Sequence, residues 1–431
     1  MSVLRRVFED GAWADRALHG EARRLGLDPR ERAMATRLAY GAVQRRATLD
    51  HLIERFAGRS TDRLEPLVLA ALRLGLYQLA YLDRIPAHAA VTESVELVKP
   101  DSPAGAKLVN AVLRRGAREA AAAVAALPDA TPQEAALRHS HPEWIATLWF
   151  GAFGPVAARA LMAADNEPAE AALRANTLRG DAPALAAELP VATHPADGLP
   201  EGLVLDAPFD AFDSPLRQAG RFMPQSRAAM AVARLVGPAP GERVLDLCAA
   251  PGGKTTHLAA LMEGRGELVA VERHAGRADA LRRTAARMGA DNVTVRTADA
   301  AEPQPGPFDR VLVDPPCSDL GTLASRPDAR WRKDADTPQR LARTQAAILR
   351  AGADAVRPGG TLVYSTCTLS PAENEDLIRA FLAGRGDFLA DDLRAEVPLW
   401  NHEGVPGFLQ TLPHRDGTEG FFIARLRKEP A

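Results

Sequence analysis

Apolar positions in the first third of the chain recur at helical spacing. Residues 32–55 place apolar side chains three and four positions apart, which predicts helix. Residues 66–81 are apolar on nearly every face, a pattern typical of a central buried helix. Two further helical patterns cover 89–97 and 108–118, and an alanine-rich tail runs to Pro128. We therefore predict an all-α domain over residues 1–130.

The pattern over residues 131–222 is mixed. Short apolar runs at 171–176 and 202–205 indicate strands, and frequent prolines punctuate the segment. We expect a linker helix followed by a small α/β, RRM-like subdomain.

From residue 223 to 431 short apolar runs alternate with helical patterns. The predicted strands are 244–247, 268–271, 293–295, 311–313 and 362–364, and the predicted helices are 255–262, 277–288 and 338–356. Such alternation predicts a Rossmann-like, doubly wound and mostly parallel sheet. Sheets of this kind bind ligands beyond the carboxyl ends of their strands.

Composition changes this picture little. The formal net charge is −2, so a nucleic-acid partner would need a local basic surface. Residues 1–60 hold twelve Arg, no Lys and eight acids, a local excess of positive charge. Charges interrupt the N-terminus, and no run of 18 apolar residues occurs, so we expect no signal peptide and no membrane partner. Three cysteines are too few for a disulfide framework and favour a cytoplasmic location.

A glycine-rich turn follows the first predicted strand of this region. Its residues are Cys248, Ala249, Ala250, Pro251, Gly252, Gly253 and Lys254, followed by Thr255. Adjacent glycines let the backbone approach a ligand at the start of a helix. The dinucleotide motif G-x-G-x-x-G is absent, whereas Gly253-Lys254-Thr255 matches the end of a phosphate-binding loop whose first glycine would be Cys248. A phosphate loop and a methyl-donor loop both remain open on this segment alone.

Three acidic residues follow later strands. Glu272 ends the second strand, where a carboxylate can accept ribose hydroxyls. Asp299 follows the third strand, placed to accept from an adenine amino group. Asp314 ends the fourth strand and begins Asp-Pro-Pro-Cys-Ser, a stiff turn that has no purpose in a phosphate-binding loop enzyme. We expect all three carboxylates to bind a cofactor.

Two cysteines follow consecutive strands of the predicted sheet core. Cys317 closes the Asp-Pro-Pro-Cys turn, and Cys367 follows the fifth strand. A lone cysteine after a strand is most often a small buried apolar residue. Two at the ligand edge of one sheet favour thiol chemistry instead.

At these residues the chain resembles the NOL1/NOP2/Sun family of RNA 5-methylcytosine methyltransferases. The matching segments are the loop at 248–255, Asp-Pro-Pro-Cys-Ser at 314–318, the segment 365–375 that begins Ser-Thr-Cys-Thr, and the closing residues 412–417 with 420–422. The resemblance implies S-adenosyl-L-methionine as cofactor, Cys367 as nucleophile on carbon 6 of cytosine and Cys317 as the residue that promotes release. Asp314 would then hydrogen-bond ring N3 and also contribute to the cofactor pocket.

Residues 1–127 separately resemble a NusB-type RNA-binding domain, on the segments 28–32, 72–79, 85–91 and 108–114. A NusB-like domain joined to this catalytic domain is similar to the bacterial branch of the family that modifies 16S ribosomal RNA. The resemblance implies a monomeric cytoplasmic enzyme whose partner is free or partly assembled small-subunit rRNA.

The sequence departs from the family's pattern in two places. Glu272 stands where the family usually has Asp, and Gln225-Ser226 stands where it has Gln-Asp. No His or Cys spacing indicates a metal site. Two other functions stay open at this point: a phosphate-loop nucleotidase and a non-enzymatic RNA-binding factor.

Overall fold

The computed structural model describes residues 1–397 and 400–430. Contacts divide the chain into two compact units. The first contains residues 1–168 and 323–335, and the second contains 169–322 and 336–431. The sequence-based boundary at residue 131 thus differs from the division at 168, because the helices of 132–164 pack with the N-terminal helices.

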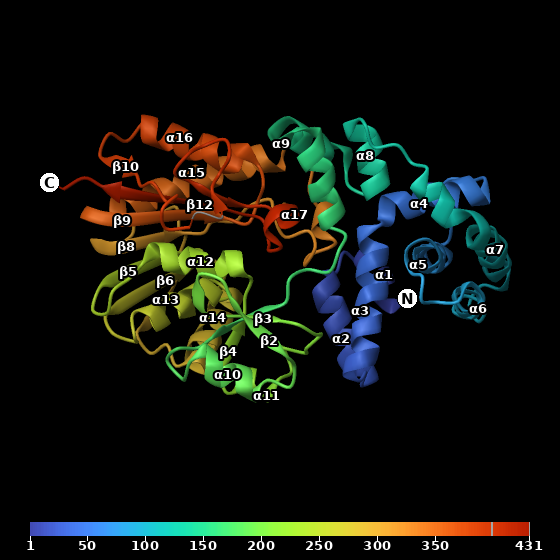
Figure 1. Cartoon of the computed structure of the whole chain (residues 1–431), viewed down its shortest axis with the longest axis horizontal. Coiled ribbons are helices and arrows are strands. Elements are labelled where there is room, and N and C mark those ends of the chain that lie inside the picture. Colours follow the sequence, from blue (N-terminus) through green and yellow to red (C-terminus); the bar gives the residue numbers. More distant parts are fainter. Residues whose placement is uncertain (398–399, 431) are drawn as a thin grey trace. The chain divides into compact units, whose positions relative to one another are not determined.

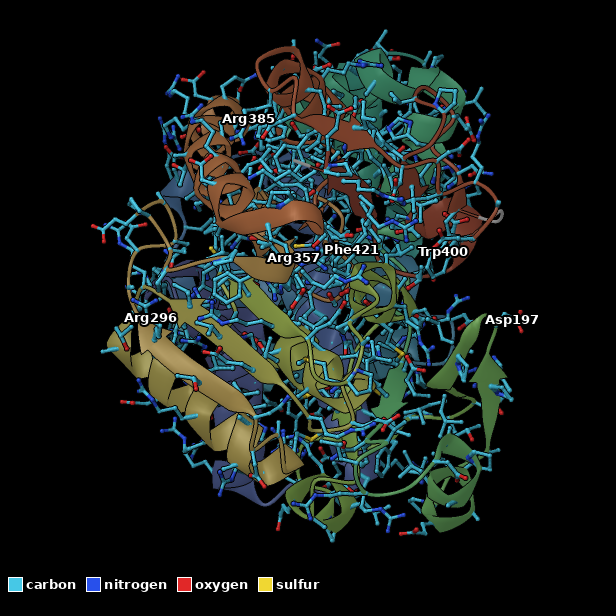
Figure 2. All side chains as sticks on the ribbon, turned by 90° about the vertical axis from the view of Figure 1, so that its left-hand side faces the viewer. Asp197, Arg296, Arg357, Arg385, Trp400 and Phe421 are labelled. Carbon is cyan, nitrogen blue, oxygen red and sulfur yellow. The ribbon has the colours of Figure 1, made fainter. Side chains whose placement is uncertain are left out.

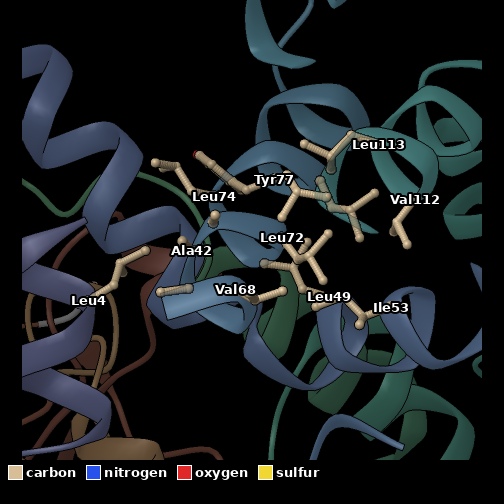
Figure 3. Close-up of a cluster of buried hydrophobic side chains, with 14 of the residues drawn as sticks. Leu4, Ala42, Leu49, Ile53, Val68, Leu72, Leu74, Tyr77, Val112 and Leu113 are labelled. Atoms are coloured by element: carbon tan, nitrogen blue, oxygen red, sulfur yellow. The ribbon is translucent and has the colours of Figure 1, made fainter. Parts of the chain in front are cut away.

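The first unit is helical, as the spacing predicted. Its helices are α1 (Ser2–Phe8), α2 (Ala14–Leu25), α3 (Pro29–Gln44), α4 (Arg46–Ala57), α5 (Pro66–Tyr81), α6 (Ala87–Glu96), α7 (Pro103–Ala125), α8 (Pro132–His139) and α9 (Glu143–Ala164), with short turns η1 (Thr61–Arg63) and η2 (Ala329–Trp331). Helix α5 supplies Val68, Leu72 and Leu74, among other side chains, to the core drawn in Figure 3. Its predicted central, buried position is confirmed.

Helix α9 is the only described helix long and apolar enough, by length and composition, to cross a membrane. Gly154 adopts non-helical angles (φ 76°, ψ 166°) and Pro155 follows it inside the helix. The break divides α9 into two pieces, each shorter than the roughly 20 residues needed to span a bilayer.

Residues 323–335 lie between two stretches of the second unit in sequence but pack in the first unit. The Trp331 indole donates to the Val43 carbonyl at 2.8 Å. The fully buried Arg330 guanidinium donates to the Asp165 carbonyl at 3.0 Å and to Asn166 Oδ1 at 2.9 Å. The chain after the Asp-Pro-Pro-Cys turn therefore continues into a segment that packs on N-terminal helices. No local pattern in the sequence predicts this packing.

The second unit begins with a four-stranded antiparallel sheet in the order β2-β3-β1-β4. Its elements are β1 (Ala172–Ala175), α10 (Ala182–Glu188), β2 (Thr193–Ala196), β3 (Leu199–Leu205), α11 (Pro215–Gln218) and β4 (Phe222–Pro224). The short strands expected near 171–176 and 202–205 are confirmed as β1 and β3.

The larger sheet follows from residue 227 onward. Its elements are α12 (Arg227–Val236), β5 (Arg243–Leu247), α13 (Gly253–Leu261), β6 (Glu267–Glu272), α14 (Ala275–Met288), β7 (Val293–Thr297), β8 (Phe308–Val313), α15 (Thr337–Ala355), β9 (Val356–Thr366), η3 (Pro371–Glu373), α16 (Glu375–Ala383), β10 (Phe388–Ala390), β11 (Leu409–Thr411), α17 (Pro413–Asp416) and β12 (Phe421–Lys428). All five predicted strands and three predicted helices are present (Figure 1).

The strand order is β10-β12-β9-β8-β5-β6-β7, with β9, β8, β5, β6 and β7 parallel. Alternate side chains of one strand enter opposite cores: Val244 packs with α12 and α13, and Leu245 packs with α15 and α16. The Rossmann-like doubly wound prediction is confirmed. The order reverses between β5 and β8, the point at which such sheets bind their ligands.

Candidate functional site

The glycine-rich turn lies directly after β5, beside the reversal of strand order. Cys248 and Gly252 both have positive φ, 67° and 104°, and α13 begins at Gly253. A Cβ at Gly252 would lie 2.7 Å from Leu281 Cδ1, whereas a Cβ at Gly253 would meet nothing within 4 Å. The turn therefore leaves open space beside the free N–H groups of a helix, which suits a small ligand that backbone must approach closely.

The buried carboxylate of Asp246 lies under this turn. Its Oδ2 accepts a hydrogen bond from Thr255 Oγ1 at 2.7 Å. Its Oδ1 is buried and has no hydrogen-bond partner among the described residues. Burial raises the pKa of Asp246 to about 7.

We expect Asp246→Asn to change the pH dependence of stability. An acid whose folded pKa lies above its unfolded pKa of about 3.9 destabilises the fold as pH rises from roughly 4 to 7. Asn keeps the acceptor for Thr255 and cannot ionise. The free energy of unfolding of the variant, from urea titrations, should exceed that of wild type at pH 8 and not at pH 4. Equal curves at both pH values would show that Asp246 stays neutral or is solvated.

The predicted cofactor acids lie at the same sheet edge. Glu272 ends β6, is 3% exposed and accepts from the His274 backbone N–H at 2.8 Å. Asp299 follows β7 and accepts from the Ala301 N–H at 3.0 Å. The structure thus brings both carboxylates to the ends of neighbouring parallel strands, as expected from the sequence.

Asp314 lies between the glycine-rich turn at 248–254, the donor turn, and the two thiols. Its Oδ2 lies 2.7 Å from Lys254 Nζ, and its Oδ1 accepts from Ser365 Oγ at 2.9 Å. The Lys254 ammonium lies 5.1 Å from the ring centre of Phe421, labelled in Figure 2. Burial lowers the pKa of Lys254. The nearby Asp314, together with Cys367 and Asp246, raises it, and the pKa is raised overall. A cation is therefore fixed between the turn and the strand end that carries Cys367.

Cys317 and Cys367 form a close pair of thiols. Their sulfurs lie 3.3 Å apart, although 50 residues separate them in sequence. Cys317 is 8% exposed and Cys367 is partly exposed. Cys248 lies apart in the donor turn, and burial raises its pKa strongly. The two cysteines that the sequence singled out for thiol chemistry are the two that meet.

A buried scaffold holds the two cysteine loops together. Glu373 is fully buried and accepts from the Ser318 backbone N–H and Gln345 Nε2, both at 2.9 Å, and from the Ser318 hydroxyl. Asn374 accepts from Thr366 Oγ1 at 2.6 Å and donates to the Thr368 carbonyl at 2.9 Å. Sequence reasoning assigned no role to Glu373, Asn374, Ser318 or Gln345, although Ser318 lies in the Asp-Pro-Pro-Cys-Ser segment. Only their closeness to the cysteines in sequence could have signalled the first two.

The small sheet contributes a fully buried arginine to the donor turn. Arg174 of β1 donates to the Gly253 carbonyl at 2.5 Å, to Thr256 Oγ1 at 2.8 Å and to Gln225 Oε1 at 2.6 Å. Burial lowers its pKa to about 9. No sequence motif signalled this residue. Gln225, which begins the segment that departs from the family's pattern, serves as one of its anchors.

We expect Arg174→Met to weaken binding of the methyl donor. Three hydrogen-bond acceptors around the turn would lose the guanidinium that donates to them. An unpaired buried polar group costs roughly 1–3 kcal/mol. Calorimetry with S-adenosylhomocysteine should show a Kd raised about tenfold or more, which Arg174→Lys partly restores. The control is Arg221→Met, which removes a partly exposed arginine paired with Glu188 in the same subdomain. An unchanged Kd in a less stable Arg174→Met protein would reduce Arg174 to a structural residue.

Comparisons with known proteins agree with this geometry. A family model described as 16S rRNA methyltransferase RsmB/F matches residues 233–427, the NusB family matches 1–118, and an RsmF/B-like ferredoxin-like domain matches 141–211. The chain is 38% identical to a probable ribosomal RNA small subunit methyltransferase B of Synechocystis, over 99% of this chain and 98% of that protein. It is 37% identical to the ribosomal RNA small subunit methyltransferase B of Thermus thermophilus, over 96% and 92%.

Among solved structures, PH0851 matches with a TM-score of 0.83 and 25% identity, over 99% of this chain and 97% of that chain. NSun6 from Pyrococcus horikoshii shares the fold of 67% of this chain, over 99% of its own length, at a TM-score of 0.62 and 24% identity. The RsmB/F family match over residues 233–427 and the two ribosomal RNA methyltransferase relatives favour a methyl-donor turn over a phosphate-binding loop.

Proposed function

Because the chain belongs to the ribosomal RNA small subunit methyltransferase B family, we propose that it methylates carbon 5 of a cytidine in 16S rRNA. The reaction proceeds through a covalent adduct between Cys367 and the base. The observation that carries the proposal is the thiol pair, whose sulfurs lie 3.3 Å apart at the ligand edge of the sheet.

S-adenosyl-L-methionine is the cofactor of this methyltransferase and supplies an electrophilic methyl group when bound. The turn at 248–254 would hold it, with room beside Gly253. Glu272 would accept from the ribose, and Asp299 from the adenine amino group. The buried Oδ1 of Asp246 has no hydrogen-bond partner among the described residues, and a cationic donor bound above it would favour the ionised form of this acid.

The Cys367 sulfur attacks carbon 6 of cytosine as the thiol loses its proton, and the electrons of the ring's 5,6 double bond make carbon 5 nucleophilic. Ring N3 is an acceptor, so Asp314 acts on it as an acid: it donates a hydrogen bond or its proton to N3 as the ring gains negative charge, which stabilises the adduct. Lys254 interacts electrostatically with Cys367 and favours its thiolate. Once carbon 5 carries the methyl group, a water molecule accepts the carbon 5 proton, the electrons of that C–H bond restore the 5,6 double bond, and the pair of the bond between carbon 6 and sulfur leaves with Cys367; Cys317 assists this release.

A base stacked within a helix hides carbons 5 and 6, so the target cytidine must be unstacked or flipped out. The NusB-like first unit supplies RNA affinity in this proposal. Its Arg-rich first 60 residues offer phosphate contacts.

Bisulfite sequencing tests the proposal. 16S rRNA from cells that lack this protein should lose one protected cytidine, and the purified protein with S-adenosyl-L-methionine should restore it. Mass spectrometry of the digested product should find 5-methylcytidine. An unchanged bisulfite pattern, or a methyl group on another atom, would contradict the proposal.

A further inference from the structure

A third acidic group lies at the thiol pair and has no role in the chemistry described so far. Asp319 Oδ1 lies 3.5 Å from Cys367 Sγ and 3.9 Å from Cys317 Sγ. These distances suit thiol–carboxylate hydrogen bonds, which are long because sulfur is large. One carboxylate oxygen therefore contacts both thiols at once.

The backbone of Asp319 is held in a conformation that favours glycine. Its φ is +59°, a left-handed value that non-glycine residues rarely adopt and that strains the backbone. Such strain in the chain is found most often where a side chain must be held at a functional site. Here the left-handed residue is the one whose carboxylate contacts both sulfurs.

The loop that carries Asp319 is fixed to the strand end that carries Cys367. The Gly321 backbone N–H donates to the Cys367 carbonyl at 2.9 Å, and Gly420 N–H donates to the Gly321 carbonyl at 2.7 Å. Thr322 Oγ1 donates to the Asp319 carbonyl at 3.0 Å. The distance from the carboxylate to Cys367 is thus set by the backbone, as a defined proton path requires.

The other carboxylates near the thiols have different partners in this structure. Asp314 uses both oxygens for Lys254 and Ser365, and Glu373 is fully buried among Ser318 and Gln345. Asp319 and Cys367 are both partly exposed, so each is accessible from outside the protein, as contact with a cytosine ring requires. Asp319 is the described carboxylate that forms a hydrogen bond with the sulfur of Cys367.

We propose that Asp319 is a further catalytic residue, the proton acceptor and donor of the Cys367 thiol; this inference rests on the proposed function. As the Cys367 sulfur bonds to carbon 6, the thiol proton passes to Asp319 Oδ1 and the S–H electron pair stays on sulfur. When the bond between carbon 6 and sulfur breaks, its electron pair returns to sulfur and Asp319 returns the proton. This proton transfer needs no other reactant, and after release Asp319 is again a carboxylate and Cys367 a thiol.

This role also solves an electrostatic difficulty. A carboxylate beside a thiolate repels it, which by itself disfavours ionisation of the thiol. If the proton moves to Asp319 while the sulfur attacks, the two negative charges never coexist. General base assistance of this kind is worth about 10²–10⁴ in rate.

Two variants test the proposal without threatening the fold. Asp319→Asn is isosteric, and Asn tolerates positive φ; Asp319→Gly relieves the strain and leaves a space. Each is introduced into Cys317→Ala protein, and the rate of adduct formation with a 16S rRNA transcript and S-adenosyl-L-methionine is followed on denaturing gels. We expect both to slow adduct formation about 10²-fold, and formate to restore Asp319→Gly but not Asp319→Asn, whose amide fills the space. Asp291→Asn, an exposed acid-to-amide change, is the control.

The outcomes separate this inference from the function on which it rests. If the Cys317→Ala parent forms no adduct, the covalent mechanism fails and the role of Asp319 falls with it. If the parent forms the adduct and the Asp319 variants form it equally fast, only the Asp319 inference is overturned. Slowing that formate leaves unchanged in Asp319→Gly would also overturn it, since a positioning effect is not restored by a free carboxylate.

Discussion

Cys367→Ala is expected to abolish methylation, with a rate loss of about 10⁴-fold or more, because the variant lacks the atom that bonds to carbon 6. Radiolabelled methyl transfer to 16S rRNA measures the loss. Cys367 packs at the edge of a core cluster, and the Cys-to-Ala change there removes one partly exposed sulfur. The protein should therefore fold and bind S-adenosylhomocysteine with the wild-type Kd.

Two results would contradict this expectation. Methylation that persists in Cys367→Ala would exclude Cys367 as nucleophile. A protein–RNA adduct in Cys367→Ala would assign the attack to Cys317, whose sulfur lies only 3.3 Å away.

Cys317→Ala is expected to stop the reaction after methyl transfer, so that protein remains bonded to RNA. The Cys317 thiol assists release in the proposed mechanism, while Cys367, Asp314 and Lys254 keep their contacts. The adduct should appear as a slower band on a denaturing gel and should disappear in the double variant Cys317→Ala, Cys367→Ala. A Cys317→Ala enzyme that turns over at the wild-type rate would remove Cys317 from the mechanism.

Local patterns predicted the elements of the catalytic unit well. The run 244–247 is apolar at every position but Asp246, and it became β5 because buried parallel strands have apolar side chains on both faces. The turn after it was recognisable because adjacent glycines and a following helix pattern are local features. The same holds for Cys317 and Cys367, whose places after β8 and β9 follow from short apolar runs and stiff turns.

Domain limits were harder to predict, because packing between distant segments is not written in local spacing. Residues 323–335 follow the Asp-Pro-Pro-Cys turn by only a few positions, yet Arg330 and Trp331 are satisfied by carbonyls of the first unit. Deleting residues 1–130 would remove the Val43 carbonyl that Trp331 contacts while leaving Asp165 in place, so the deletion disturbs the fold and is a poor test of RNA binding by the first unit.

The sequence by itself determined the helical first third, the doubly wound sheet and the positions of the donor turn, the three acids and the two cysteines. These depend on periodicity and on turn chemistry, which act over a few residues. The tertiary structure alone decided that two sulfurs 50 residues apart lie 3.3 Å from each other, that Glu373 and Asn374 hold their loops, that Arg174 anchors the donor turn and that Asp319 faces both thiols. Each of these depends on how loops and strands far apart in the sequence pack together, which the strand order of the sheets fixes and local patterns do not.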